Sequence, residues 1–594
     1  MEAITLGGAV GWYHPANGGR GVVVVGAHGY EDLCSRVTLR ILADDLAAAG
    51  LPTLRLDPRD TGDAADLAPG DDRVAAWKAD VVAAVRFMRE TVGVAEVALV
   101  GLRVGALFAS AAAADLGDID RMVLMAPPPN GRAHARELSI LARLVDGTSG
   151  GVQTDGAIEI GGFRLDTATL AELAAIDLTA LPRAPAGKVT LVGDVGSAGL
   201  GRIAAAFEAR GAEVEQLPFT GYARMMCDPT ASEPATEVIA AVAVALARDL
   251  PEDRTTAPQL SPGRIDGDGW SEERFVFGDG LAGVLCLPTG AIALRRTAIW
   301  LNSGRNHHIG WARQAVEMSR RLAEYGVAVL RFDLAGIGDS PARADTPAAA
   351  LYHPGGRVDV DAAIAELERR GLMRPWLIGA CSGAYQAYHT AVDDPRITGI
   401  ALVNQLCFIW DASYAVHLSA WMRARPHEFE SEQKRAEAAE GEGETGSRGP
   451  LGLLWKLAKR TVRIGLDTYR RIKIGAGGGG RIERGFRTLA ARGVAVSIVL
   501  SEGDKSESEL ELHTGPDGER IAGLPGVEIL HIPNADHSLS PVAARRKLAR
   551  HLIGRLAGDD AAEGAGAAAP VEGARARRPA SGSATGLLAT RGMR

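Results

Sequence analysis

The chain has few cysteines, no excess of basic residues and no long apolar run, and each lack excludes a class of protein. Its five cysteines are odd in number and show no spacing typical of a metal site or a disulfide framework, which favours a reducing cytoplasm. The net charge of -8, without a basic stripe, argues against a nucleic-acid binder. No stretch approaches the roughly 18 apolar residues of a membrane span, and no signal-peptide pattern precedes the first apolar run.

What the chain does have is apolar sequence for more than one core. It is 594 residues long and 46% hydrophobic, so two or more domains are expected. Short apolar runs alternate with amphipathic helical stretches along both halves, which predicts a mostly parallel sheet covered by helices in each. The sequence therefore predicts an α/β protein with two tandem, doubly wound sheet domains.

The same landmarks recur in the same order in the two halves. Each half opens with an apparent hairpin. The run 54–57 (Leu-Arg-Leu-Asp) followed by Asp63 parallels the run 330–333 (Leu-Arg-Phe-Asp) followed by Asp339. One structural plan is therefore expected twice.

These repeats set the expected domain boundaries. We expect a first domain over residues 1–250 and a second over 270–558, joined by a Pro-, Thr-, Asp- and Gly-rich linker over 251–269. The second domain carries a longer insert, at about 408–482, which is expected to form a helical lid. Residues 559–594 are rich in Ala, Gly, Pro and Arg, which predicts a disordered tail.

A basic amphipathic stretch, 451–474, lies inside the insert and has three interpretations. Its helical periodicity favours a lid helix that covers an apolar pocket. Basic amphipathic helices also bind anionic lipid, so a peripheral membrane contact stays open. A helix that docks a protein partner is the third interpretation.

The most informative motif is Gly-Ala-Cys-Ser-Gly at residues 379–383, directly after an apolar run. It has the form Gly-x-nucleophile-x-Gly, which marks the sharp strand-to-helix turn on which α/β-hydrolases expose a nucleophile. Glycines flank that turn because its strained backbone leaves no room for side chains. The frame centres on Cys381, and Ser382 is the rival nucleophile.

The remaining members of a catalytic triad follow in the order nucleophile, acid, histidine. Asp504 comes directly after an apolar run, with Glu502 as the substitute acid, and His537 follows the last predicted strand. At a helix N-terminus beside His537, the sulfur of Cys381 would favour the thiolate form. Asp504 would orient His537 and stabilise its cationic form.

Acyl transfer also needs donors for the oxyanion that develops on the substrate. The backbone N–H of Ser382 is one candidate, and the backbone N–H of Arg305, in the loop after an apolar run, is the second. His307 and His308 in the same loop are expected to line the pocket mouth or satisfy backbone groups. This chemistry requires no cofactor and no metal.

The first half has the same frame with a different centre. Residues 101–105 read Gly-Leu-Arg-Val-Gly, and Tyr222 aligns with His537, while Asp194 keeps the acid position. The guanidinium of Arg103 has no free lone pair and cannot attack a carbonyl, but it can hold a carboxylate or phosphate. The first domain is therefore expected either to bind an anionic ligand near Arg103 or, as favoured, to act as a scaffold.

Both halves resemble the α/β-hydrolase superfamily, over nearly all of residues 1–558. The first half, with arginine at its elbow, is similar to hydrolase-like proteins associated with exosortase and exopolysaccharide gene clusters. The second half resembles bacterial serine or cysteine hydrolases with a Cys-Ser-Gly elbow. The resemblance implies hydrolysis of carboxylic esters or thioesters through an acyl-enzyme, or acyl transfer in polysaccharide or lipid assembly.

The resulting hypothesis is a cytoplasmic hydrolase that acts on a small-molecule acyl ester or thioester through Cys381, His537 and Asp504. An acyltransferase is one alternative, because water exclusion depends on the lid. A non-catalytic ligand-binding or assembly protein is the other. The sequence does not predict substrate or oligomeric state.

Overall fold

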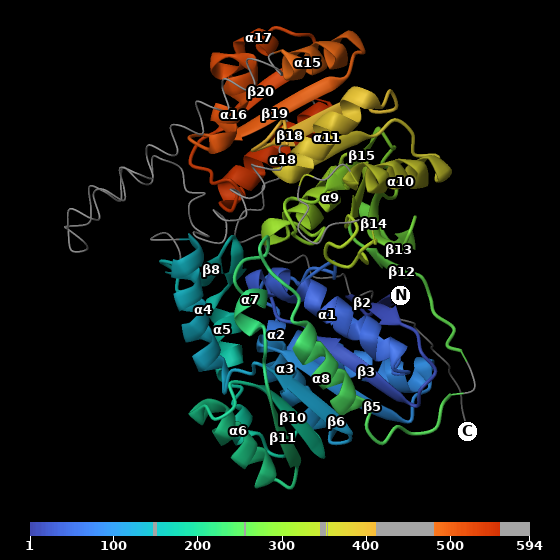
Figure 1. The fold of residues 1–594 in the computed structure, drawn as a ribbon, viewed down its shortest axis with the longest axis vertical. Coiled ribbons are helices and arrows are strands. Elements are labelled where there is room, and N and C mark those ends of the chain that lie inside the picture. Colours follow the sequence, from blue (N-terminus) through green and yellow to red (C-terminus); the bar gives the residue numbers. More distant parts are fainter. Residues whose placement is uncertain (147–150, 255–256, 345–351, 353–354, 411–479, 559–594) are drawn as a thin grey trace, which may run out of the picture.

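The two halves of the chain form two separate sheets, blue to green and green to red in Figure 1. The computed structural model describes residues 1–146, 151–254, 257–344, 352, 355–410 and 480–558. The first half is residues 1–250, the second half is residues 270–558, and residues 251–269 connect them.

The first half builds an eight-stranded sheet. Its strands are β1 (Glu2–Leu6), β2 (Ala9–His14), β3 (Arg20–Val25), β4 (Thr53–Asp57), β5 (Glu96–Leu102), β6 (Arg121–Met125), β10 (Lys188–Gly193) and β11 (Glu213–Pro218). They lie in the order β1-β2-β4-β3-β5-β6-β10-β11. The β1–β2 hairpin and the β2–β4 pair are antiparallel, and all following pairs are parallel.

Helices cover both faces of this sheet. The helical elements are α1 (Tyr30–Ala48), α2 (Arg73–Phe87), η1 (Met88–Val92), α3 (Val104–Leu116), α4 (Gly131–Asp146), α5 (Thr167–Ala174), η3 (Leu178–Ala180), α6 (Ala198–Glu208), α7 (Tyr222–Met225) and α8 (Thr236–Leu246). Apolar residues of α1 and α8 form one core, and those of α2, α3 and α6 form another. A small sheet that the sequence did not predict is made of β7 (Gly151–Val152), β8 (Ile158–Ile160) and β9 (Phe163–Leu165).

The second half, together with residues 263–266, repeats the plan in a nine-stranded sheet. Its strands are β12 (Gly263–Asp266), β13 (Trp270–Phe277), β14 (Leu281–Pro288), β15 (Arg296–Leu301), β16 (Val327–Phe332), β17 (Trp376–Ala380), β18 (Gly399–Val403), β19 (Ala495–Ser501) and β20 (Val527–Ile532). After β12 the order is β13-β14-β16-β15-β17-β18-β19-β20, the same sequence of crossovers as in the first sheet. Two mostly parallel, helix-covered sheets confirm the predicted fold class.

The helices of the second half also divide between two faces. They are η4 (Trp311–Arg313), α9 (Gln314–Glu324), α10 (Gly356–Arg369), α11 (Ser382–Asp393), α15 (Arg481–Ala491), α16 (Lys505–Thr514), η5 (Pro516–Gly518), α17 (Glu519–Ala522) and α18 (Val542–Ala557). Apolar residues of α9 and α18 form one core, and those of α10, α11 and α15 the other. This arrangement matches the pairing of α1 with α8, and of α2 with α3, in the first half.

One part of the predicted linker is a strand. β12 lies within residues 251–269 and pairs with β13, so the second sheet begins before residue 270. Its side chains alternate, and Ile265 is buried against Val10 and Ala64 of the first half. The polar and glycine-rich composition concealed this short alternating pattern.

Several predicted features fall where the structure gives no description. The lid insert between residues 411 and 479, the basic stretch 451–474 and the tail 559–594 lie outside the described residues. Within the part of the chain that is described, no helix combines the length and the apolar character needed to cross a membrane.

Candidate active site

Cys381 lies at a strained turn between β17 and α11. Its φ of 53° and ψ of -114° are unusual for a residue with a side chain, and its N–H donates to the carbonyl of Val403 at 2.9 Å. A Cβ on Gly379 would lie 2.2 Å from the backbone of Gly383, and a Cβ on Gly383 would lie 2.6 Å from the carbonyl of Asn302. Only glycines allow strand, helix and neighbouring loop to approach this closely.

Of the two candidate acids, Asp504 is the one that contacts the histidine. Its carboxylate lies 3.0 Å from Nδ1 of His537 and accepts a hydrogen bond from the N–H of Ser506, which caps α16. Asp504 is buried, whereas Glu502 is exposed. The carboxylate that can orient the imidazole is therefore that of Asp504.

His537 interacts with Cys381 as well as with Asp504. Burial lowers the pKa of His537, but the Asp504 carboxylate and the nearby Cys381 outweigh burial and place this pKa well above its usual value. Burial raises the pKa of Asp504, but His537 outweighs it and lowers that pKa. The surroundings thus stabilise an imidazolium that faces the cysteine sulfur.

Ser382 has a different environment from its neighbour. Its Oγ accepts a hydrogen bond from the backbone N–H of Gly304 at 2.9 Å, and the residue is buried. Cys381 is only partly buried. The serine hydroxyl therefore fixes the adjoining loop, while the cysteine sulfur is the more accessible of the two candidate nucleophiles.

The loop that carries Arg305 is held from both halves of the chain. The Asn302 side chain donates to the carbonyl of Asn306 and to the Asp333 carboxylate, each at 2.9 Å. The Arg305 guanidinium donates to the carbonyl of Ser232, in the first half, at 3.1 Å. These contacts hold the backbone of Arg305 beside the start of α11, whose first N–H groups have no partner within the helix.

Asn404 is a contributor that the sequence analysis missed. Its side-chain amide donates to the Ser501 hydroxyl and to the carbonyl of His537, each at 2.8 Å, and accepts from the N–H of Ser501 at 2.7 Å. It thereby joins the ends of β18 and β19 to the loop after β20 that carries His537. Its place directly after a buried strand is the signal that could have revealed it.

Tyr352 is a second missed residue. Its hydroxyl lies 3.7 Å from the sulfur of Cys381, and its ring stacks on Trp410 with 4.4 Å between centroids. It comes from the loop before α10, where no periodic pattern marks it.

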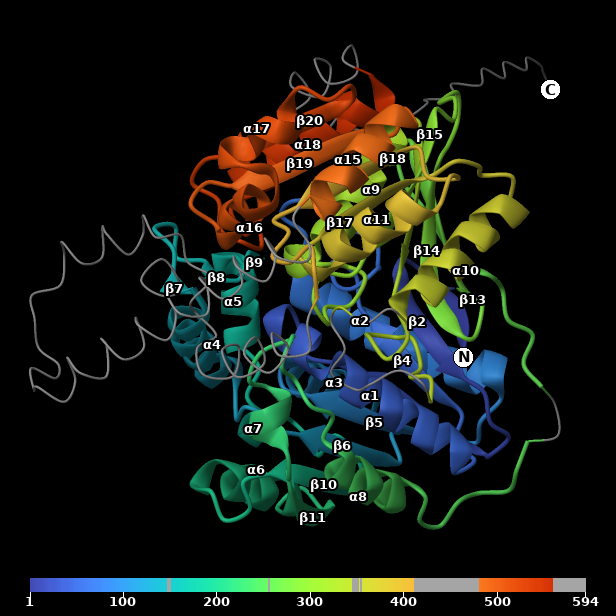
Figure 2. The same ribbon diagram turned by 45° about the horizontal axis from the view of Figure 1, so that its top comes forward.

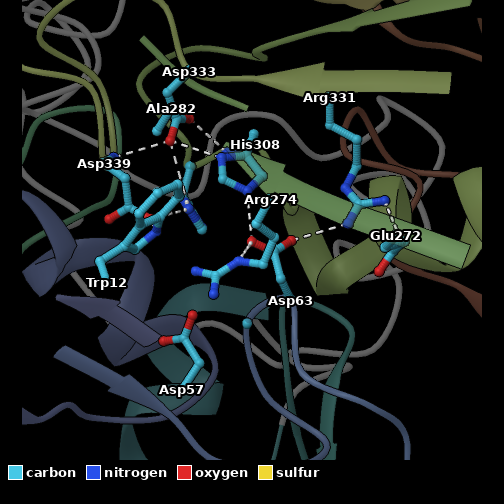
Figure 3. Close-up of polar contacts among 12 residues, drawn as sticks. Trp12, Asp57, Asp63, Glu272, Arg274, Ala282, His308, Arg331, Asp333 and Asp339 are labelled. Carbon is cyan, nitrogen blue, oxygen red and sulfur yellow. Dashed lines mark hydrogen bonds and ion pairs between the residues drawn. The ribbon is translucent and has the colours of Figure 1, made fainter. Parts of the chain in front are cut away.

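A buried charge cluster links the site to the first half of the chain (Figure 3). The imidazole of His308 lies 2.8 Å from the Asp333 carboxylate through Nδ1 and 2.8 Å from the Asp63 carboxylate through Nε2. Arg331 also contacts Asp63, at 3.0 Å. Burial lowers the pKa of His308, but Asp63 and Asp333 outweigh it and raise this pKa to about 10. A charged histidine therefore bridges the two halves.

Asp339 is held mainly by residues of the first half. It accepts hydrogen bonds from Trp12 at 2.9 Å, from Arg36 at 2.9 and 3.0 Å and from Arg55 at 2.5 Å. His307, in the loop that follows β15 of the second half, lies 3.0 Å away. Through Asn302, His307 and His308, Asp333 and Asp339 hold the loop that follows β15.

The side chains that offer ligand atoms for a metal ion in this cluster are already paired. Ligand atoms of His307, His308, Asp333 and Asp339 lie within 4.8 Å of one another. Arginine guanidinium groups supply positive charge to Asp339, and His308 supplies it to Asp333. This donor set is occupied by internal ion pairs, which is the arrangement expected for buried charges.

The elbow of the first half has the same backbone conformation, but the charge of its central residue, Arg103, is balanced by carboxylates. Arg103 has a φ of 54° and a ψ of -121°, and its N–H donates to the carbonyl of Met125 at 3.0 Å. Its guanidinium donates to Glu31 at 2.8 Å and to Glu137 at 2.6 Å. Two carboxylates thus occupy the positions where an anionic ligand would bind. Asp194, at the acid position, is exposed.

Known proteins resemble this chain only distantly. No protein-family model matches it, and no curated protein does.

Similar solved structures include an α/β hydrolase of unknown function from Agrobacterium tumefaciens, at 15% identity over 48% of this chain and 97% of that chain, with a TM-score of 0.30. Ferulic acid-bound Est1E from Butyrivibrio proteoclasticus matches at 14% identity over 42% and 96%, with a TM-score of 0.30. Dienelactone hydrolase from Anabaena variabilis matches at 11% identity over 47% and 95%, with a TM-score of 0.28. Because these similarities are distant, the chemistry has to be inferred from the geometry of the site itself.

Proposed function

We propose that the second half is a hydrolase of carboxylic esters or thioesters that works through an acyl group on Cys381. The observation that carries this proposal is the position of the His537 imidazole, whose Nδ1 lies 3.0 Å from the Asp504 carboxylate, while Cys381, at the strained turn before α11, is close enough to raise the pKa of this imidazole. A nucleophile, a base and an orienting acid close together are what covalent acyl transfer needs.

The proposed reaction uses each of these groups once per half-reaction. The Cys381 thiolate attacks the acyl carbon, the bond to the leaving alkoxide or thiolate breaks, and His537 gives that group its proton through Nε2. His537 then takes a proton from water, whose oxygen attacks the acyl-cysteine. The carbon–sulfur bond breaks, which releases the acid and restores the Cys381 thiolate beside the His537 imidazolium. Asp504 holds Nδ1 throughout.

The oxyanion of both steps would be stabilised by the backbone N–H groups of Ser382 and Arg305. What supports this assignment is the bond between Gly304 and the Ser382 hydroxyl, because it keeps the loop and the helix start together. Removing one donor of this kind typically costs about 100- to 1000-fold in rate.

For the first half, residues 1–250, we propose a scaffold role toward the catalytic second half, residues 270–558. Its Arg103 is paired with Glu31 and Glu137, so an anionic substrate would have to displace one of these carboxylates from the guanidinium. Asp63 and the carbonyl of Ser232 instead contact the loop that carries Arg305.

The test is turnover of short- and long-chain p-nitrophenyl esters and of acyl-thioesters by the full chain. Cys381→Ala should abolish turnover, whereas Cys227→Ala, at an exposed cysteine, should leave it unchanged. Ser382→Ala identifies the nucleophile: if this variant is inactive while Cys381→Ala stays active, the assignment to cysteine is wrong.

A thiol-reactive probe at neutral pH gives a second readout. We expect fast labelling of Cys381 that slows sharply in His537→Ala, because the imidazolium stabilises the thiolate. Slow and equal labelling of all five cysteines, together with no turnover of any ester, would favour a non-catalytic binding protein instead.

A further inference from the structure

The first half contains an open cavity of about 120 Å³ that the proposed reaction does not use. It lies beside the loop that follows β3 and is covered by the strands β8 and β9, which Figure 2 shows at the boundary between the halves. Its apolar lining includes Leu138, Ile158, Ile160, Phe163, Leu165 and Ile309. Ile309 belongs to the second half, directly after His308, whereas the other five belong to the first half. The cavity is therefore complete only in the full chain.

The charged side chains that line this cavity already have opposite partners. Arg36 is paired with Asp57, Arg73 is paired with Asp60, and Arg313 with Asp66. An ionic ligand would have to give up its hydration and compete with one of these pairs. The lining therefore favours a ligand without charge.

His28 is a polar group of the lining that lacks a partner. Its Nε2 is buried and makes no hydrogen bond with any described residue. Its ring packs edge-on against Trp77, with 4.3 Å between centroids, and against Phe108. Burial lowers the pKa of His28 to about 3, so the imidazole is neutral. A buried polar atom without a partner costs stability unless a ligand or water satisfies it.

Asp32 is a second polar group of the lining, and its ion pair is a long one. Nη1 of Arg36 lies 3.9 Å from its carboxylate, beyond hydrogen-bond distance. Burial raises the pKa of Asp32 to about 6. A hydroxyl group can donate to a carboxylate and accept from a carboxylic acid, and it can also pair with a neutral imidazole.

We propose that this cavity is a separate ligand site for an uncharged molecule with an apolar body and a hydroxyl group. The apolar body would lie against β8, β9 and Ile309, and the hydroxyl would reach His28 and Asp32. The proposal is independent of catalysis by the second half, because binding is measured without turnover.

The test is calorimetric titration of the full chain with phenylbutanol at neutral pH. Phenylbutyrate and phenylbutylamine, which have the same apolar body and a negative or positive charge, are the controls. We expect saturable binding of the alcohol and at least about tenfold weaker binding of both ions. No saturable binding of the alcohol, or tighter binding of either ion, would overturn the proposal.

Two variants locate the site. Leu165→Trp fills the cavity and should weaken alcohol binding at least about tenfold, whereas Leu144→Trp, at an exposed position on α4, should not change it. His28→Phe keeps the ring shape and removes the unpaired nitrogen. We expect this variant to bind the alcohol more weakly while its Tm rises, a combination that a purely structural histidine would not give. Unchanged binding in both Leu165→Trp and His28→Phe would place the alcohol elsewhere and refute the assignment.

Discussion

The two elbows of this chain have the same backbone and opposite chemical character. Cys381 and Arg103 differ by about a degree in φ and by a few degrees in ψ, and each donates its N–H to the end of the next strand. Close glycines enforce the turn at both places. The strained turn is therefore retained where no nucleophile is present, so it follows from packing of strand on helix and does not by itself indicate catalysis.

What differs is the set of side chains around each turn. Asn404 and Ala126 occupy matching positions, with φ of 45° and 44° and N–H groups that donate to Val499 and Val192. Only the asparagine has a side chain that can join the strand ends to the histidine loop. The second half therefore has a side chain that holds the loop carrying His537, and the first half has none at the matching position.

The largest effect is expected from moving the nucleophile. Cys381→Ala should lower kcat/KM for an ester substrate at least about 1000-fold, because the covalent step is lost. Adding Arg103→Cys to that variant should restore nothing, since Tyr222 stands where a base is needed. Recovery of turnover in the double variant, measured with p-nitrophenyl butyrate, would show that the first half is catalytically competent.

The next largest effect is expected at His308, whose imidazole joins Asp63 of the first half to Asp333 of the second. His308→Gln should lower the free energy of unfolding by about 3–4 kcal/mol, because Asp333 loses its closest buried cation and Asp63 keeps only its arginine partners. The pKa of His308 is raised to about 10 in the folded state, so its contribution is full below the unfolded pKa of about 6.5 and is lost as pH rises through about 10.

Denaturant titration of this variant and the wild type across that pH range is the measurement. The stability difference between them should shrink toward high pH. His531→Gln, at an exposed histidine paired with Glu507, is the matched control and should change stability by less than about 0.5 kcal/mol. A constant difference at all pH values would mean that His308 is neutral in the fold.

A smaller loss of stability is expected at the elbow of the first half. Arg103→Met leaves the buried carboxylate of Glu31 without its partner and should cost about 2–3 kcal/mol in chemical unfolding. Arg89→Met, which breaks an exposed pair with Asp118, should cost less than about 1 kcal/mol. If Arg103→Met is as stable as the wild type, the guanidinium is not a structural group and an anionic ligand again becomes its most reasonable role.

The smallest effect is expected from Asn404, whose side chain holds the loop that carries His537. Asn404→Ala should lower kcat/KM about tenfold, because hydrogen bonds to His537 and Ser501 worth about 1–2 kcal/mol are lost. Ala126→Asn, the reverse change at the matching position of the first half, should leave kcat/KM unchanged. Steady-state kinetics of both variants give the two values of kcat/KM to compare. Equal losses of kcat/KM would show that Asn404 acts only through general stability.

Much of the fold could be predicted because its signals are local. Apolar runs such as 97–100 and 376–378 lie within observed strands, since strands buried on both faces need continuous apolar sequence. β12 and the β7–β9 sheet were missed because they are short and their burial depends on partners distant in the chain. Tyr352 was missed for the same reason, as nothing near it in sequence indicates a neighbouring sulfur.

The sequence alone determined the repeated sheet plan, the two glycine-flanked turns and the order in which cysteine, acid and histidine occur, because each is a pattern of neighbouring residues. Only the tertiary structure decided that Asp504 and not Glu502 contacts His537, that Arg103 is neutralised and that Asp63 of one half holds a histidine of the other. These outcomes depend on which charges share a buried space, where an unpaired ion is costly, and folding brings those charges together from positions 33 to 245 residues apart.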